Sequence, residues 1–296
     1  MAVGGHGAVL TAGDGVEYDA FRLPLRCELA AARVRAERCD MGLSKRERRP
    51  RPVAHRGAGG QAPENTAAAI RRALALGFGV IEVDARVSRD GVVMLLNDAT
   101  LERTTDGTGP VAARTAAELA RLDAGGWHAA RFAGGRVLTL PQALGLIDGR
   151  ARVNIDIKTE AAIAPVLRLL DGSDWRDRVL ISGCVAEWAK EVRRLDPAID
   201  LLLNHGEVPA DPGDGRAGWR VGFLAAATEL GALGLNVDYR LVTSEFCAAA
   251  QRAGLQVWTY TIDDPVRYRA VAETGVDYIT SNWPDRMMEL LDGADD

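Results

Sequence analysis

Acidic residues occupy alternate positions in two short apolar runs of the sequence. Glu82 and Asp84 lie in VIEVD (80–84), and Asp156 lies in VNIDI (153–157). Alternate side chains of a β-strand point to the same face, so Glu82 and Asp84 are expected to lie side by side. Carboxylates flanked by valine and isoleucine are costly to bury unless they are paired or bind a metal. Three carboxylates at one site suit a hard divalent cation, Mg²⁺ or Ca²⁺.

Two basic residues accompany these acids. Arg56 follows the run VAH (53–55), and Lys158 lies two residues after Asp156. One alternative is that the acids are simply paired with these two cations and hold no metal. Three acids exceed two cations, which favours the metal. Arg56 and Lys158 also supply the positive charge that an anionic phosphoryl substrate requires.

His55 is the best acid–base candidate among the four histidines of the chain. A neighbouring cation and nearby carboxylates can hold the pKa of an imidazole where proton transfer is useful. A lone histidine at the end of a strand is more often structural, so its position alone is a weak indication. The hypothesis that His55 is catalytic therefore depends on the charged residues around it.

From Val53 onward, short apolar runs alternate with alanine-rich segments that are typical of helices, for example 64–76 and 244–253. This alternation is typical of βα units with a mainly parallel sheet. Eight candidate strands predict an α/β fold, a closed (β/α)8 TIM barrel whose active site lies at the carboxyl ends of the strands. The candidate strands are residues 53–55, 80–84, 153–157, 179–182, 200–204, 235–239, 257–261 and 278–281.

The run VVMLLN (92–97) is not one of the eight barrel strands. Only about four residues, with Asp90 and Gly91 among them, separate it from the strand before it. A parallel crossover needs a dozen or more residues, so this connection is predicted to be an antiparallel hairpin. With a turn near Asp90, Asn97 returns to about the level of Glu82, and we expect it in the pocket.

The composition excludes several classes of protein. The chain has 296 residues and a net charge of −5, so it lacks the excess of basic residues that nucleic-acid binding requires. No apolar run approaches the ~20 residues that span a bilayer, and the N-terminus lacks the pattern of a secretory signal. Four cysteines without CxxC pairs argue against a disulfide framework and a zinc site, so a cytoplasmic location is expected. The oligomeric state is not indicated.

The first 51 residues are predicted to be an N-terminal extension that precedes a barrel over residues 52–296. RCELAAARVRAER (26–38) could form one amphipathic helix, and KRERRPRP (45–52) is interpreted as a solvated basic linker. Met41 is an alternative start of translation, in which case the first 40 residues would have no function.

Six ordered blocks of the sequence resemble the glycerophosphodiester phosphodiesterase family. Together they extend from Val53 to Asp285. The resemblance implies a phospholipase-C-like TIM barrel that uses a divalent metal to hydrolyse glycerophosphodiesters, which are small phosphate esters, to glycerol 3-phosphate and an alcohol. The blocks are HRGAGGQAPENT (55–66), IEVDARVSRDGVVMLLND (81–98), LERTTDGTG (101–109), NIDIK (154–158), VWTYTIDD (257–264) and GVDYITSNWPD (275–285).

The resemblance also implies roles for single residues. His55 corresponds to a catalytic histidine, and Arg56 and Lys158 correspond to phosphate contacts. Trp258 corresponds to an aromatic residue that lines the substrate pocket. Residues 101–138 correspond to a small insertion that caps the barrel, in which Thr104, Thr105 and Gly107 suit a tight loop. The family's acidic metal ligands correspond to Glu82, Asp84 and Asp156.

The sequence departs from the family's pattern at four places. The family usually has His-Asp where this chain has Asn97-Asp98, and Glu where it has Asp156. A Ser-Phe is common where Gly183-Cys184 stands, and the last strand usually ends in Thr-Asp, here Ser281-Asn282. Only the first departure changes proton chemistry directly, because the amide of Asn97 can contact a substrate by hydrogen bonds but has no useful pKa.

Three hypotheses account for Asn97. In the first, the chain binds metal and phosphate but turns over slowly, or not at all. In the second, its substrate has a good leaving group, such as pyrophosphate, which needs no proton. In the third, His128 or His205 supplies the proton. A variant without a second histidine could also stop at a cyclic phosphate, if a hydroxyl of the substrate is the nucleophile.

Overall fold

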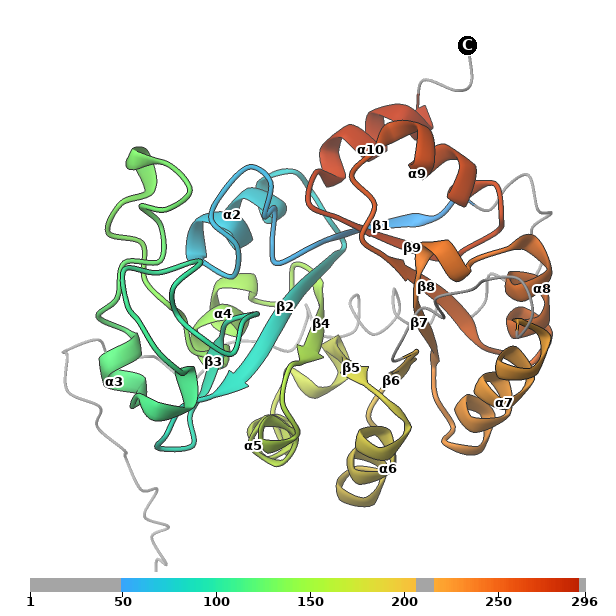
Figure 1. Cartoon of the computed structure of the whole chain (residues 1–296), viewed down its shortest axis with the longest axis horizontal. Helices are drawn as coiled ribbons and strands as arrows, with labels where there is room; N and C mark the ends of the chain where they lie inside the picture. Colours follow the sequence, from blue (N-terminus) through green and yellow to red (C-terminus); the bar gives the residue numbers. More distant parts are fainter. Residues whose placement is uncertain (1–48, 206–215, 293–296) are drawn as a thin grey trace, which may run out of the picture. The chain divides into compact units, whose positions relative to one another are not determined.

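Eight parallel strands form a closed barrel in the computed structural model, which describes residues 49–205 and 216–292. β1 (Arg51–Ala54) pairs with both β2 (Val80–Val87) and β9 (Tyr278–Ser281), and this double pairing closes the ring. The predicted TIM barrel and its eight strands are confirmed (Figure 1). The remaining barrel strands are β4 (Arg152–Ile157), β5 (Val179–Cys184), β6 (Leu201–Asn204), β7 (Gly234–Asp238) and β8 (Gln256–Tyr260).

Strand β3 (Val93–Leu95) pairs antiparallel with β2, as the short connection predicted. The turn includes Gly91, whose φ of 82° favours glycine and whose N–H donates to the carbonyl of Ser88. Ala85 is opposite Leu95, and the same register places Asn97 opposite Val83. Asn97 therefore comes back one residue short of the level that the sequence predicted.

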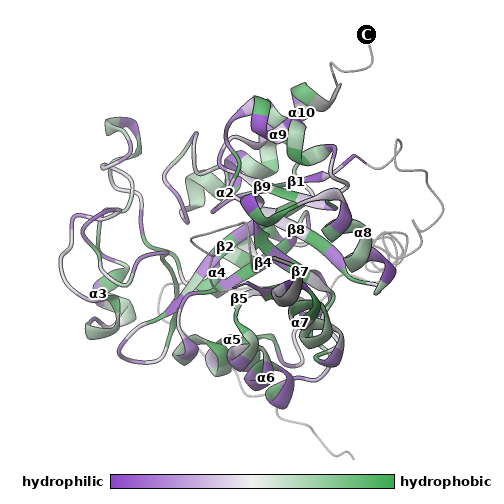
Figure 2. Cartoon of the chain, turned by 45° about the vertical axis from the view of Figure 1, so that its right-hand side comes forward, coloured by the Kyte–Doolittle hydropathy of each residue, from purple (hydrophilic) through white to green (hydrophobic). Residues whose placement is uncertain are grey.

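Helices follow the strands of the barrel and pack apolar faces against them. Figure 2 shows purple and green stretches alternating along α6 and α8, as expected for helices with one buried face. The two predicted helices are confirmed, each beginning after a capping threonine, Thr66 or Thr243. The helices are α2 (Ala67–Ala75), α4 (Leu140–Ile147), α5 (Ile163–Leu170), α6 (Ala186–Leu195), α7 (Arg216–Glu229), α8 (Ser244–Arg252), α9 (Pro265–Ala272) and α10 (Pro284–Asp292).

The segment between β3 and α4 has a small apolar cluster of its own, separate from the main core. Met94 and Leu96 contribute to this cluster, whereas Val93 and Leu95 belong to the main core, so β3 is covered on both faces. The hydroxyl of Thr105 donates to the carbonyl of Leu101 at 2.7 Å, which makes the tight loop that the sequence suggested. The cluster consists of Met94, Leu96, Leu101, Val111, Leu119, Ala124 and Val137.

Short helical turns complete the described chain. Within the segment between β3 and α4 lie η1 (Val111–Ala113), α3 (Ala116–Leu119) and η2 (Ala130–Phe132). The others are η3 (Glu160–Ala162), η4 (Arg176–Arg178) and η5 (Tyr239–Leu241). The proposal that residues 101–138 cap the barrel remains a prediction.

The first 48 residues lie outside the described part of the chain, and with them the predicted helix at 26–38 and the first half of the predicted linker at 45–52. Strand β1 begins at Arg51, one residue before the predicted start of the barrel. Within residues 49–205 and 216–292, no helix is long and apolar enough to cross a membrane. Cys184 and Cys247 are both buried, and the cytoplasmic location stays a prediction.

The barrel interior has an apolar layer beneath a polar one. The apolar layer comprises Val53, Val80, Leu180, Leu202, Trp258 and Tyr278. Side chains two residues further along a strand point the same way but lie nearer the carboxyl end. At five of these six positions, that next residue lines a cavity at the barrel mouth: His55, Glu82, Asn204, Tyr260 and Thr280. The layering thus separates the residues that fill the barrel from those that face the opening.

Trp258 belongs to the lower layer, so the prediction that it lines the substrate pocket is wrong. Its side chain is fully buried, and its ring stacks on Tyr278 with 3.8 Å between the ring centroids. The indole N–H donates to the side chain of Gln256. Tyr260, two residues later on the same face, is the aromatic residue of β8 that lines the cavity. The prediction failed because Trp258 lies one side-chain layer deeper in the barrel than the residues that line the cavity.

Replacing Trp258 by alanine should therefore destabilise the fold rather than weaken substrate binding. Loss of a fully buried tryptophan leaves a cavity and should lower the free energy of unfolding by about 3–5 kcal/mol, measured by chemical denaturation. Trp127→Ala is the matched control, with a smaller expected loss because Trp127 is already 41% exposed. Equal losses in the two variants would contradict the layered interior.

Candidate active site

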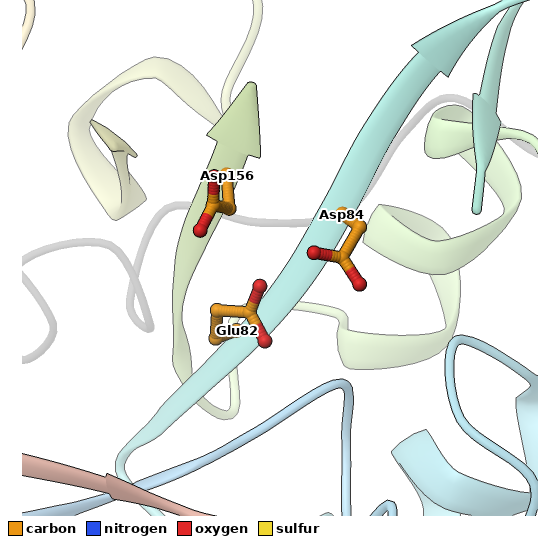
Figure 3. A group of neighbouring side chains, drawn as sticks. All are labelled: Glu82, Asp84 and Asp156. Carbon is orange, nitrogen blue, oxygen red and sulfur yellow. The ribbon is translucent and has the colours of Figure 1, made fainter. Parts of the chain in front are cut away.

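Three carboxylates from two neighbouring strands meet at the barrel mouth. Glu82 and Asp84 lie on β2, and Asp156 lies on β4 with its Cα paired to that of Asp84. Figure 3 shows the three side chains on the same face of the two strands. One oxygen from each lies within 4.8 Å of the others. The convergence predicted from the alternating acids is thus present.

Asp84 is fully buried and interacts with four side chains, two by hydrogen bonds and two by ion pairs. Its Oδ1 lies 3.1 Å from the Lys158 ammonium and accepts from the Asn97 amide at 3.0 Å. Its Oδ2 lies 3.2 Å from the Arg56 Nε and accepts from the Asn65 amide at 2.7 Å. Burial alone would raise the pKa of Asp84, but Lys158 and Arg56 outweigh burial and hold the pKa well below its usual range.

Glu82 and Asp156 each keep one buried oxygen to which no protein donor is hydrogen-bonded, Oε1 of Glu82 and Oδ1 of Asp156. Burial raises the pKa of both carboxyls, and the neighbouring acids raise the pKa of Glu82 further. Buried acceptors without donors are costly. Two such oxygens beside a third carboxylate fit a hard cation such as Mg²⁺ or Ca²⁺, so these residues suit a divalent metal.

His55 follows β1 and lies 3.9 Å from Glu82, measured from Nε2 to the carboxylate. Its Nδ1 is 2.7 Å from the side-chain oxygen of Asn282, and its Nε2 accepts from the Nε of Arg56 at 3.2 Å. Burial, and then the charge of Arg56, lowers the pKa of His55 to about 4. At neutral pH the ring is therefore uncharged, with one nitrogen able to accept a proton.

Arg56 and Lys158 are the cations of the site. Arg56 has a φ of 55°, and this turned backbone directs its N–H to the Glu82 carboxylate at 2.7 Å. The Lys158 ammonium also lies 3.2 Å from Asp156. Burial would lower the pKa of Lys158, but Asp156 and Asp84 raise it, so the side chain stays charged. The alternative that the acids are paired with the two cations is thus realised in part. Asp84 is paired with both cations, whereas one oxygen of Glu82 and one of Asp156 have no protein donor.

A cavity of about 390 Å³ opens among these groups. Five of the predicted site residues line it: His55, Arg56, Glu82, Asp156 and Lys158. The lining also includes His205, which the sequence suggested as an alternative proton donor, and residues that were not assigned from the sequence, among them Trp188, Asn204, Asn236 and Tyr260. The signal that could have found Asn204 and Tyr260 is their spacing, two residues after a buried apolar residue of the same strand.

Asn97 contacts Asp84 and is not among the residues that line this cavity. Its amide N–H donates to Asp84, and its backbone carbonyl accepts from the Arg86 Nε at 2.8 Å. It lines a smaller pocket together with Thr104 and Ala124 of the segment that follows β3. The structure thus places Asn97 against a carboxylate of the site, with a role in substrate binding remaining a prediction.

The two other histidines of the hypotheses for Asn97 differ in position. His205 follows β6 and lines the cavity, with its ring 4.3 Å from the Trp219 ring between centroids. His128 packs between Trp127 and Phe132 and does not line it. Only His205 of these two is placed where it could exchange a proton with a molecule in the cavity.

The sequence also left Glu64 and Asn65 unassigned. Asn65 adopts a φ of 58° and binds Asp84 twice, through its amide N–H and by accepting the backbone N–H of Asp84 at 3.0 Å. Glu64 accepts from Arg56 at 2.7 Å and from both terminal nitrogens of Arg103 at 2.8 Å. Both residues lie in the block ENT just before the cap of α2, and an asparagine before a helix cap is a signal for a left-handed turn.

Gly183 makes room for Asp156. It has a φ of 79°, and a methyl group at its position would lie 2.1 Å from the Oδ1 of Asp156. Its N–H donates to the side chain of Asn204 at 2.8 Å. Two departures from the family's pattern, the glycine and the short acid, are therefore adjacent in space and compatible with each other.

Comparison with known proteins agrees with this geometry. The profile of the Glycerophosphoryl diester phosphodiesterase family matches residues 55–286. A glycerophosphodiester phosphodiesterase of Caldanaerobacter subterraneus is 29% identical over 245 residues, which cover 81% of this chain and 96% of the relative.

Solved structures are similar over the same region. A phosphodiesterase of Oleispira antarctica in complex with the product sn-glycerol-3-phosphate is 27% identical, with a TM-score of 0.73, and the match covers 84% of this chain and all of that one. A glycerophosphodiester phosphodiesterase of Agrobacterium tumefaciens is 31% identical, with a TM-score of 0.67, over 81% of this chain and 99% of that one.

Gly183→Ala should weaken binding of a divalent ion by roughly 10- to 100-fold, the range for displaced neighbours of metal ligands, because the methyl group displaces Asp156. Calorimetric titration with Mg²⁺ and with Ca²⁺ would measure this. Gly254→Ala is the matched control, since Gly254 has a φ of 77° and nothing within 4 Å of the added methyl. Both variants carry the cost of positive φ, so an equal effect on ion binding would contradict a role for the space beside Asp156.

Proposed function

Because the chain belongs to the glycerophosphoryl diester phosphodiesterase family, we propose that it cleaves glycerophosphodiesters to glycerol 3-phosphate and an alcohol in a reaction that requires a divalent metal. Its enzyme class is phosphoric diester hydrolase. The observation that carries the proposal is one cavity lined by a neutral imidazole, two cations and two carboxylates that each keep an unpaired oxygen. The glycerol 3-phosphate in the Oleispira antarctica structure supports a small phosphate ester as substrate.

Glu82, Asp84 and Asp156 would hold the metal, which when bound supplies positive charge to orient the phosphate and activate the attacking oxygen. Either Mg²⁺ or Ca²⁺ suits an all-oxygen set of ligands. A dication would compete with the Lys158 ammonium for Asp84 and Asp156, to which that ammonium is now paired. Lys158 lines the cavity, so once released from the two acids it could contact the phosphate.

His55 would act as the acid–base group. Its Nε2 carries a lone pair toward Arg56, whose guanidinium also lines the cavity. A phosphate bound by Arg56 would bring the attacking oxygen, of water or of a hydroxyl of the substrate, near this nitrogen, and its proton would pass to Nε2. Arg56 and Lys158 would stabilise the negative charge that develops on the phosphoryl oxygens.

Protonation of the leaving alcohol is the step for which Asn97 is unsuited. Its amide already donates to Asp84, and an amide has no useful pKa. His205 is the better candidate donor, since it lines the same cavity. If no group protonates the alcohol, the chain would favour a substrate with a good leaving group, such as pyrophosphate, or bind phosphate and metal without turnover. An attack by a hydroxyl of the substrate would then end at a cyclic phosphate.

Release of glycerol 3-phosphate from glycerophosphocholine should depend on Mg²⁺ or Ca²⁺ and cease with EDTA. His55→Ala should lower kcat by roughly 10²- to 10⁴-fold, the usual contribution of an acid–base group. His128→Ala is the matched control and should behave as the parent protein, because His128 does not line the cavity. Activity that survives both EDTA and His55→Ala would contradict the proposed function.

Asn97→His and His205→Ala separate the alternatives for the second proton. If His205 protonates the alcohol, His205→Ala should lower kcat by about 10²-fold or more, and Asn97→His should restore part of the loss in the double variant. An increase of kcat in Asn97→His alone would instead identify an enzyme that lacks its second acid. Separation of the products by chromatography would detect a cyclic phosphate. Tight binding of metal and glycerol 3-phosphate without turnover in any variant would favour a binding protein.

A further inference from the structure

A chain of hydrogen bonds leads from the surface of the barrel mouth to His55. Asp263 follows β8 and is exposed, whereas Asn282 follows β9 and lies between Asp263 and the imidazole. The Oδ2 of Asp263 accepts from the side-chain amide of Asn282 at 2.7 Å, and its Oδ1 accepts from the backbone N–H of Asn282 at 2.8 Å. The side-chain oxygen of Asn282 then faces the Nδ1 of His55 at 2.7 Å.

The chemistry of these groups determines which way the amide of Asn282 points. An ionised carboxylate only accepts hydrogen bonds, so the NH₂ group of Asn282 must face Asp263. Its carbonyl oxygen must then face His55, and a carbonyl can only accept. Nδ1 of the neutral ring therefore carries the proton, and Nε2 keeps the lone pair toward Arg56 in the cavity.

We propose that Asp263 is a positioning residue that fixes the tautomer of His55 through the amide of Asn282, an inference that rests on the proposed acid–base role of His55. Asp263 does not line the cavity, so it acts on the imidazole without contacting the substrate. An asparagine by itself can present either end of its amide to a histidine. The carboxylate behind it removes that choice.

The surrounding backbone holds this chain of bonds in place. The N–H of His55 donates to the carbonyl of Ser281, and the hydroxyl of Ser281 donates to Asp263 at 3.0 Å. Gly59 and Gly60 lie against Asn282, and a methyl group on Gly59 would stand 3.3 Å from its side-chain oxygen. The N–H of Gly60 donates to the carbonyl of Asn282 at 3.0 Å. The amide thus lies between two loops that leave it little room.

Asp263→Asn should invert the tautomer without changing the shape of the side chain. The backbone N–H of Asn282 can only donate, so it holds the carbonyl end of the new amide at the position of Oδ1. The new NH₂ group then faces the NH₂ group of Asn282, which must turn its oxygen toward it. Asn282 would then donate to Nδ1 of His55, and the proton would move to Nε2. That nitrogen could then no longer accept from the Nε of Arg56, which would keep its contact with Asp84.

The expected result is a kcat lower by roughly 10²- to 10⁴-fold with little change in KM, as for loss of a general base. The ¹⁵N chemical shifts of His55, assigned with His55→Ala, should change from a proton on Nδ1 to a proton on Nε2. This spectroscopic measurement uses the full chain without substrate. It therefore reports on the tautomer even if the protein does not cleave glycerophosphocholine.

The double variant Asp263→Asn with Asn282→Asp should restore both the Nδ1 tautomer and most of kcat. A carboxylate at position 282 accepts from the new amide on one side and from Nδ1 of His55 on the other. Asn282→Asp alone should not restore or preserve activity, because it places two carboxylates in contact where the amide now donates to Asp263. Recovery only in the double variant distinguishes an effect on proton position from general damage to the loop.

Asp264→Asn is the matched control. It makes the same chemical change at the next residue, whose side chain caps α9 by accepting the N–H of Arg267 at 2.8 Å, and asparagine caps equally well. It should leave kcat and the tautomer unchanged. An unchanged tautomer in Asp263→Asn, or parental kcat there while His55→Ala is inactive, would overturn the inference and leave the proposed function standing. Parental activity in His55→Ala would instead refute the proposed function.

Discussion

The burial of the Asp84 carboxylate is the constraint around which the site is arranged. A charge with no exposed surface must be compensated by donors. Four side chains provide them here, from the β1–α2 loop and from the segments just after β3 and β4. These donors come from three separate parts of the chain. Because they must all reach one carboxylate, the hairpin, the loop and the strand end are held together at the barrel mouth. Positions of Arg56 and Lys158 therefore follow from a charge balance as much as from the barrel itself.

The remaining charge balance favours an added cation. Asp84 takes most of the positive charge of the site, and Glu82 and Asp156 are left with raised pKa values and one unpaired oxygen each. The layer of the barrel interior beneath these oxygens is apolar and adds no charge to balance them. Burial, together with the charge of Arg56, keeps His55 neutral, so the site places an uncharged base beside two carboxylates that each keep an unpaired oxygen.

Much of this arrangement could be predicted from the sequence, because strands and their side-chain alternation are local properties. The alternation at Glu82 and Asp84 placed both acids correctly, and the short connection after β2 predicted the hairpin of β3. Depth within the barrel could not be predicted in this way, since it depends on the relative stagger of neighbouring strands. Trp258 was therefore placed one layer too high. The interplay of Asp263 with Asn282 also escaped prediction, because it joins the ends of two strands through side-chain chemistry alone.

The carboxylate of Glu64 serves two arginines at once. It binds Arg56 at the cavity and Arg103 in the segment after β3, and Arg103 in turn binds Asp98, the neighbour of Asn97. An anion that draws Arg56 toward the cavity must compete with Glu64 for the guanidinium. Any weakening of that pair leaves more of the Glu64 charge to Arg103. Glu64 therefore forms a direct electrostatic link between a residue that lines the cavity and the loop that bears Arg103.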